Sequence, residues 1–72
     1  MKTKVKFKEV VTMLTKYNNP LGDLCRDILS DKEFPINNQQ KALKTVRFIG
    51  NYYYLEEEAN ELIEIYKTLN KE

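Results

Sequence analysis

Apolar residues recur every three or four positions in four separate stretches of this 72-residue chain, and Pro20 and Pro35 fall between successive stretches. Such spacing places the apolar side chains on one face of an α-helix, whereas a half-buried strand would show strict alternation. A proline has no amide donor and does not fit a helix interior, so it separates one helix from the next. The pattern therefore predicts an all-α fold, a small four-helix bundle.

The first two predicted helices meet at Asn18-Asn19-Pro20. Pro20 suits the first turn of a helix, and Asn19 is well placed to cap that helix. The second helix is expected to end at Phe34-Pro35, because the residue before a proline is pushed out of helical geometry, and Phe34 is expected to pack under the joint. The two apolar stripes are Phe7, Val10, Val11, Leu14 and Tyr17, then Leu21, Leu24, Cys25, Ile28 and Leu29.

The third predicted helix follows the polar pair Asn37-Asn38, which offers caps, and is expected to stop in a left-handed turn at Gly50-Asn51. The run from Tyr52 to Leu55 is interpreted as a packed connection, since no second strand exists to pair with it. Glu56-Glu57-Glu58 suits the positive end of a fourth helix dipole. The two apolar stripes are Ala42, Leu43, Val46 and Ile49, then Ala59, Leu62, Ile63, Tyr66 and Leu69.

The length favours one helical domain over residues 1–72, with 1–5 and 70–72 expected to fray. The single cysteine, Cys25, cannot form an internal disulfide, and its place on an apolar stripe predicts a core position. No apolar run approaches the roughly 20 residues that cross a bilayer, and the amino-terminal stretch lacks the apolar region of a secretory signal. A cytoplasmic protein that does not enter membranes is expected.

No residue pattern points to catalysis. Histidine is absent, which removes the commonest general base and the commonest transition-metal ligand. Cys25 with carboxylates supplies too few thiolates for a structural zinc site. With only Gly22 and Gly50, no glycine-rich phosphate loop can form, and the glutamates from Glu56 to Glu64 are typical of a solvated helix face. We therefore expect no catalytic residues, no metal site, no cofactor and no enzymatic activity.

Positive charge gathers in two places that would suit nucleic acid. Lysines alternate through the amino end, at Lys2, Lys4, Lys6 and Lys8, and Lys41, Lys44 and Arg47 share one helix face. Together these groups would contact the phosphates of DNA or RNA while the rings of Tyr52, Tyr53 or Tyr54 stack on bases. The simpler interpretation is that lysines maintain solubility and that at least two of the three tyrosines pack into the core. The net charge of +1 favours the simpler interpretation.

Roughly the last 50 residues resemble the YozE-like family of short proteins, which is known mainly from Gram-positive bacteria and their mobile elements. The resemblance rests on Gly22-Asp23-Leu24 through Asp31-Lys32-Glu33-Phe34-Pro35, on Val46-Arg47-Phe48-Ile49-Gly50-Asn51-Tyr52-Tyr53-Tyr54-Leu55, and on Ile63-Glu64-Ile65-Tyr66. It implies a sterile-alpha-motif-like fold and supplies no activity. Two departures suggest a divergent member, namely Ile63 or Ile65 where a tryptophan is expected and basic residues at Lys41, Lys44 and Arg47 where relatives tend to be acidic.

Charge is also distributed unevenly, since residues 1–16 carry five lysines and one glutamate while residues 55–66 carry five glutamates. Such patches favour a charged partner or head-to-tail self-association. For a short chain without a set of catalytic residues, binding to another molecule through surface residues is the simplest function. The sequence therefore predicts a non-catalytic accessory module that docks on a larger bacterial or mobile-element protein. A further possibility, a mobile-element protein that inhibits or modifies a host enzyme, shares this docking prediction.

Two sets of residues follow from this prediction and from its alternative, a small nucleic-acid-binding domain. The predicted partner-binding residues are Phe48, Tyr52, Tyr53 and Tyr54. The predicted contacts to phosphates or to an acidic partner are Lys4, Lys6, Lys8, Lys41, Lys44 and Arg47.

Overall fold

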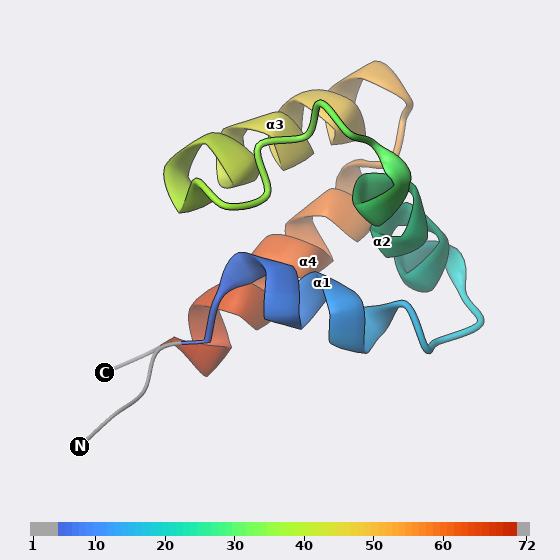
Figure 1. Cartoon of the computed structure of the whole chain (residues 1–72). Coiled ribbons are helices and arrows are strands. Elements are labelled where there is room, and N and C mark those ends of the chain that lie inside the picture. Colours follow the sequence, from blue (N-terminus) through green and yellow to red (C-terminus); the bar gives the residue numbers. More distant parts are fainter. Residues whose placement is uncertain (1–4, 71–72) are drawn as a thin grey trace.

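The computed structural model describes residues 5–70, and each of the four predicted helical stretches is a helix in it (Figure 1). Their bounds are α1 Phe7–Leu14, α2 Pro20–Ser30, α3 Gln39–Tyr52 and α4 Glu56–Leu69. Helix α4 packs against each of the other three, α1 packs on α2, and α3 rests mainly on α4. No strand occurs between residues 5 and 70. The prediction of a small all-α four-helix fold is confirmed.

All four helices contribute to one apolar core, and no polar or charged side chain in the described part of the chain is buried. Phe7 lies at its centre, with its ring stacked on Phe34 at a centroid distance of 6.1 Å and edge-on to Tyr66 at 5.5 Å. Phe34 thus packs into the core after α2, as predicted, but the helix ends at Ser30 and not at Phe34-Pro35. The buried residues are Phe7, Val10, Val11, Leu14, Leu21, Leu24, Cys25, Ile28, Phe34, Ala42, Val46, Ala59, Leu62 and Ile63.

The predicted caps form at the starts of two helices. The Asn19 side-chain oxygen accepts a hydrogen bond from the amide of Gly22 at 2.8 Å, and Pro20 occupies the first turn of α2. The Asn38 side-chain oxygen accepts one from the amide of Lys41 at 3.1 Å, at the start of α3. Each bond satisfies an amide that a helix leaves without a partner in its first turn.

Three residues assigned to the apolar stripes are exposed, so that part of the prediction is wrong. Helix α1 ends at Leu14, and Tyr17 lies beyond it in the turn to α2, 56% exposed. The backbone oxygens of Thr15 and Tyr17 accept hydrogen bonds from the Arg26 guanidinium at 2.6 and 3.2 Å, which fixes this turn. Leu29 and Leu69 lie near the ends of their helices, where the core no longer covers them.

The end of α3 also differs from the prediction. The helix does not stop at Gly50-Asn51 but continues to Tyr52, and the left-handed residue is Tyr54, with φ 59°. The amide of Leu55 donates to the backbone oxygen of Gly50 at 2.7 Å, which closes the turn. Gly50 serves another purpose, because a Cβ there would lie 2.6 Å from the Cβ of Ala59 on α4. The glycine permits a close helix approach instead of ending the helix.

Replacing Gly50 with alanine is expected to lower the free energy of unfolding by about 1–3 kcal/mol, because α3 and α4 must move apart. The loss should appear even though alanine favours a helix by about 1 kcal/mol over glycine. Denaturant unfolding followed by circular dichroism measures it. Combining Gly50→Ala with Ala59→Gly should recover much of the loss, since it removes the methyl group in the way. A Gly50→Ala variant more stable than the parent would contradict the close approach.

The two ends of the described chain lie together. The amide of Val5 donates to the side-chain oxygen of Asn70 at 2.8 Å, and the Asn70 side chain donates back to the Tyr66 backbone oxygen at 2.9 Å. The remainder of the segments expected to fray, residues 1–4 and 71–72, lies outside the described residues. None of the helices between residues 5 and 70 has the length and apolarity needed to cross a membrane.

Candidate functional site

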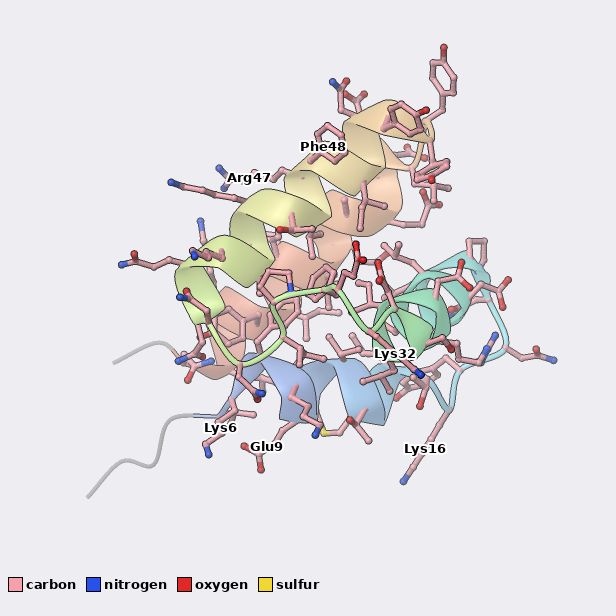
Figure 2. The ribbon with its side chains drawn as sticks, turned by 45° about the horizontal axis from the view of Figure 1, so that its top comes forward. Lys6, Glu9, Lys16, Lys32, Arg47 and Phe48 are labelled. Carbon is pink, nitrogen blue, oxygen red and sulfur yellow. The ribbon has the colours of Figure 1, made fainter. Side chains whose placement is uncertain are left out.

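Four large aromatic side chains are exposed at the carboxyl end of α3 and in the turn to α4. The exposed fractions are 64% for Phe48, 65% for Tyr52, 60% for Tyr53 and 92% for Tyr54. Figure 2 shows Phe48 on the outer side of α3, next to Arg47. We call these four residues the aromatic surface. They are the predicted partner-binding residues, and the structure brings them together.

Three rings of the aromatic surface, those of Phe48, Tyr52 and Tyr53, pack on one another. Phe48 and Tyr52, one helical turn apart, stack at 5.8 Å with 16° between their planes. Tyr52 meets Tyr53 edge-on at 4.8 Å and 83°. Such pairs are favourable beyond the area that they bury. The rings therefore support one another as an ordered apolar surface in contact with solvent.

The expectation that at least two of the three tyrosines pack into the core is wrong. On α3 the buried face is formed by Ala42, Val46 and Gly50, which follow one another at four-residue spacing. Tyr52 lies two residues beyond Gly50, about 200° further round the helix, and so faces away from the core. The core residues that α3 and α4 contribute include Val46 and Ala59 and none of these three tyrosines.

Tyr54 is held in a strained backbone conformation. Its φ of 59° is left-handed, and this region costs an L-residue with a Cβ about 1–2 kcal/mol relative to its usual conformations. Glycine adopts the same region without that cost. The ring gains almost no burial in return, because it is 92% exposed. Strained positions of this kind gather at functional sites.

Replacing Tyr54 with glycine is expected to raise the free energy of unfolding by about 1 kcal/mol, because the left-handed conformation is then relaxed. Urea unfolding measures the change. Tyr54→Ala is the matched control, since it removes the same ring but keeps a Cβ at positive φ, and it should bring no such gain. Equal stabilities for the two variants would show that the backbone of Tyr54 stores no strain.

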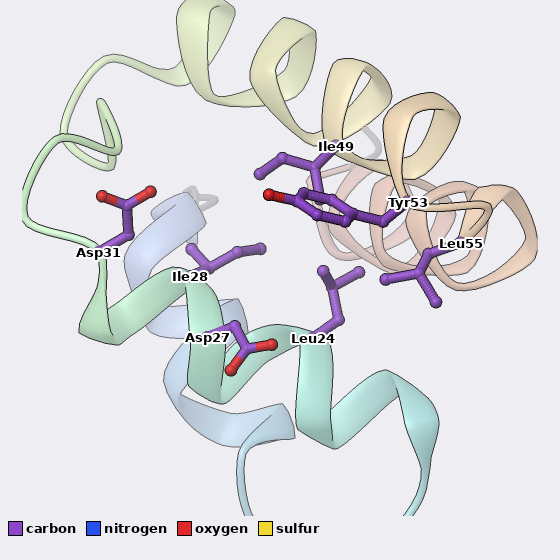
Figure 3. A pocket seen from close by; sticks show the side chains of 7 residues that line it. All are labelled: Leu24, Asp27, Ile28, Asp31, Ile49, Tyr53 and Leu55. Carbon is purple, nitrogen blue, oxygen red and sulfur yellow. The ribbon is translucent and has the colours of Figure 1, made fainter.

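A groove of about 400 Å³ opens beside the aromatic surface, between α2 and the end of α3 (Figure 3). Tyr53 belongs to both features, and Figure 3 shows its ring lying along the groove beside Ile49. The lining residues are Leu24, Asp27, Ile28, Asp31, Ile49, Tyr53 and Leu55. Sequence reasoning missed this groove, because it depends on how far α3 stands from α2. The only hint of the groove in the sequence is that Leu24 and Ile28, and likewise Asp27 and Asp31, are four residues apart.

The predicted basic residues occupy two neighbouring parts of the molecule. Lys41, Lys44 and Arg47 are all exposed along α3. Lys6 and Lys8 are exposed at the amino end of α1, where they line a second, smaller hollow together with Gln39, the first residue of α3. Lys2 and Lys4 lie outside the described residues.

Between residues 5 and 70, the acidic side chains and the thiol of Cys25 are the groups that could ligate a metal ion. No cluster of three or more Cys, Asp and Glu side chains there could hold a metal ion. The ion pair found in this part of the chain joins Arg26 to Asp23, one turn apart on the surface of α2. Cys25 is buried, and its burial raises the pKa of the thiol from 9.0 to about 11, against a smaller lowering by Arg26. The thiol therefore stays protonated at neutral pH and is a poor nucleophile.

The Cys25 pKa gives a pH dependence of stability. The thiol of the unfolded chain ionises near 9.0 and that of the folded chain near 11, so between these values the unfolded state binds fewer protons. Stability contributed by the protonated thiol is therefore lost as pH rises through this window. The free energy of unfolding of the parent should fall relative to that of Cys25→Ala between pH 8.5 and 10.5, two values chosen around the lower pKa. Parallel curves would contradict the shift.

Comparison with known proteins adds no relative: no family model, no curated protein and no solved structure matches this chain. The resemblance to the YozE-like family, and the sterile-alpha-motif-like arrangement that it implies, therefore stay predictions from the sequence.

Proposed function

We propose that this chain is a non-catalytic binding module that docks on a larger protein through the aromatic surface. The observation that carries the proposal is the contact of exposed aromatic rings with one another from Phe48 to Tyr53, continued by the almost fully exposed Tyr54. Single apolar side chains on a surface are ordinary, whereas contiguous ones mark interaction sites. Elsewhere in the described chain, the large exposed apolar residues are Met13, Tyr17, Leu29 and Leu69.

The chemistry of the rings supports a protein partner. Tyrosine and phenylalanine provide large contact areas with few rotatable bonds, so little conformational entropy is lost when they are buried against a partner. Stacking between Phe48 and Tyr52 restricts their rings before any partner arrives. A preorganised aromatic cluster is typical of the residues that supply most of the energy of a protein interface. The resemblance to the YozE-like family would make the partner a bacterial or mobile-element protein in a reducing cytoplasm.

Capture from the source lysate tests this proposal. The full chain, carrying a tag at either end, is used to isolate bound material with and without nuclease treatment, and the proteins retained are identified. A stoichiometric protein that survives nuclease and is lost with the Phe48→Ala, Tyr52→Ala double variant is the expected result. Retention of that protein by the double variant would place the docking surface elsewhere, and absence of any stoichiometric protein would count against docking.

Nucleic acid binding is the second candidate, and the position of Arg47 next to Phe48 favours it. Stacked rings beside an exposed basic row at Lys41, Lys44 and Arg47 resemble the platforms on which single-stranded bases stack while lysines and arginines contact phosphates. The net charge of +1 counts against it. If phosphate contacts dominate, affinity for a single-stranded oligonucleotide must fall steeply with salt, and Lys44→Glu should abolish binding in a folded chain. A flat salt response would eliminate this candidate.

A further inference from the structure

The groove beside the aromatic surface combines an apolar floor with an acidic wall. Leu24 and Ile28 on α2 face Ile49 and Leu55 across it, so the floor is hydrocarbon from both sides (Figure 3). Asp27 on α2 and Asp31, the residue that directly follows α2, line the same groove and are exposed. Asp27 lies beside the apolar pair on the surface of α2, one position before Ile28, and Asp31 continues the acidic wall just beyond the end of the helix.

The two carboxylates are available to a cation from outside. No ion pair within residues 5–70 involves Asp27 or Asp31, and the cationic Arg26 next to them is committed to Asp23 and to backbone oxygens of the preceding turn. Asp31 accepts one hydrogen bond, from the amide of Glu33 at 2.9 Å. The other charged neighbours along the chain are Lys32 and Glu33, both exposed. The local balance around the groove is therefore negative.

We propose that the groove binds a segment of the partner protein that carries an apolar side chain with an arginine or lysine close to it in sequence. The proposal rests on the docking function argued above and specifies the chemistry of the segment. Its apolar side chain fills the floor between Ile28 and Ile49, and its cation lies against Asp27 and Asp31. An acidic segment would be repelled, and a wholly apolar one would desolvate both carboxylates without pairing them.

The size and the chemistry of the groove limit the segment further. A volume of about 400 Å³ lies at the lower end of the range for ligand pockets, roughly 300–1,000 Å³, so it accepts one or two large side chains and not a folded element. Arginine should be preferred to lysine, because its planar guanidinium can bond to carboxylate oxygens through two parallel donors. Tyr53 continues the groove into the aromatic surface, so the rest of the partner can pack on Tyr52 and Phe48.

Peptide selection tests the proposal directly, because it does not require the partner protein itself. A random displayed library of short peptides is selected on the immobilised full chain, and individual peptides are then titrated against three forms of it. These are the parent, the Asp27→Asn, Asp31→Asn variant, and the Glu61→Gln, Glu64→Gln variant, which loses the same charge from the exposed face of α4. Circular dichroism confirms that all three forms remain folded.

The expected result is enrichment of peptides that place arginine or lysine within about one helical turn of a large apolar residue. These peptides should bind the groove variant at least tenfold more weakly than the parent, and the α4 variant within about twofold of it. Enriched peptides without basic residues, equal binding to all three forms, or no enrichment would each overturn the proposal. So would a dimer seen by sedimentation that the groove variant abolishes, because a second copy would then occupy the groove.

Failure of this inference can be distinguished from failure of the docking function. If the lysate partner is still lost with Phe48→Ala, Tyr52→Ala but is retained by Asp27→Asn, Asp31→Asn, the aromatic surface docks and the groove takes no basic segment. If both double variants retain the partner, the docking surface itself is wrong.

Discussion

Truncation of Leu62 to alanine is expected to lower the free energy of unfolding by about 2–5 kcal/mol, because the side chain leaves a cavity in a fully enclosed position. Leu62 has no exposed surface and lies on α4, the helix that contacts all the others. A domain of this length has a total stability of about 4–11 kcal/mol, so the variant should lose a large share of its stability. Denaturant unfolding followed by circular dichroism measures the loss.

The matched control for Leu62→Ala is Leu69→Ala. It removes the same atoms from the same helix, at a position that is 44% exposed. We expect a loss below about 1 kcal/mol there, since little apolar surface returns to water and no enclosed cavity forms. Similar losses at the two positions would mean that α4 does not pack through the face assigned to it.

Removal of the stacked pair, by Phe48→Ala with Tyr52→Ala, is expected to weaken binding of the captured partner by about 2–4 kcal/mol, which corresponds to roughly 30- to 1,000-fold in the dissociation constant. The two rings are mostly exposed in the free chain, so the free energy of unfolding should change by less than about 1 kcal/mol. Titration calorimetry with the purified partner gives the first quantity, and denaturant unfolding gives the second.

Met13→Ala with Tyr17→Ala is the control for that double variant. It removes a similar amount of exposed apolar surface, 46% and 56% of the two side chains, from α1 and the turn after it. Its affinity for the partner should stay within about threefold of the parent, within the scatter of energetically neutral contacts. If both double variants lost affinity alike, general hydrophobicity and not the aromatic surface would explain the binding.

Much of the fold could be predicted from the sequence because local signals agreed with one another. The apolar period, the caps at Asn19 and Asn38 and the proline at position 20 all indicate the same helices. The errors at Tyr17, Leu29 and Leu69 arise at helix ends, and another arises where one residue type serves two purposes. Glycine at position 50 predicts a helix stop, whereas it lies inside α3 to let Ala59 approach, and the left-handed turn falls on Tyr54. Only the tertiary contact distinguishes these two uses of glycine.

Less of the candidate site than of the fold could be predicted from the sequence. Phe48 and Tyr52 could have been assigned to the surface from their phase on α3, since they lie off the Ala42 and Val46 face. Because the predicted third helix stops at Gly50-Asn51, the tyrosines fall in a connection, and no helix face can be assigned to them. The groove could not be predicted, because its walls are Leu24 and Ile49 on helices whose separation is set by how each of them packs on α4.

The central claim is that the aromatic surface exists to bind a partner, and the affinity of the Tyr54→Gly variant for the captured protein tests it most directly. Glycine relaxes the left-handed backbone, so loss of folding cannot account for any loss of binding. We predict a dissociation constant at least tenfold higher together with a raised unfolding temperature. An unchanged dissociation constant in the more stable variant would mean that the ring of Tyr54 contributes nothing to docking, and it would contradict the claim.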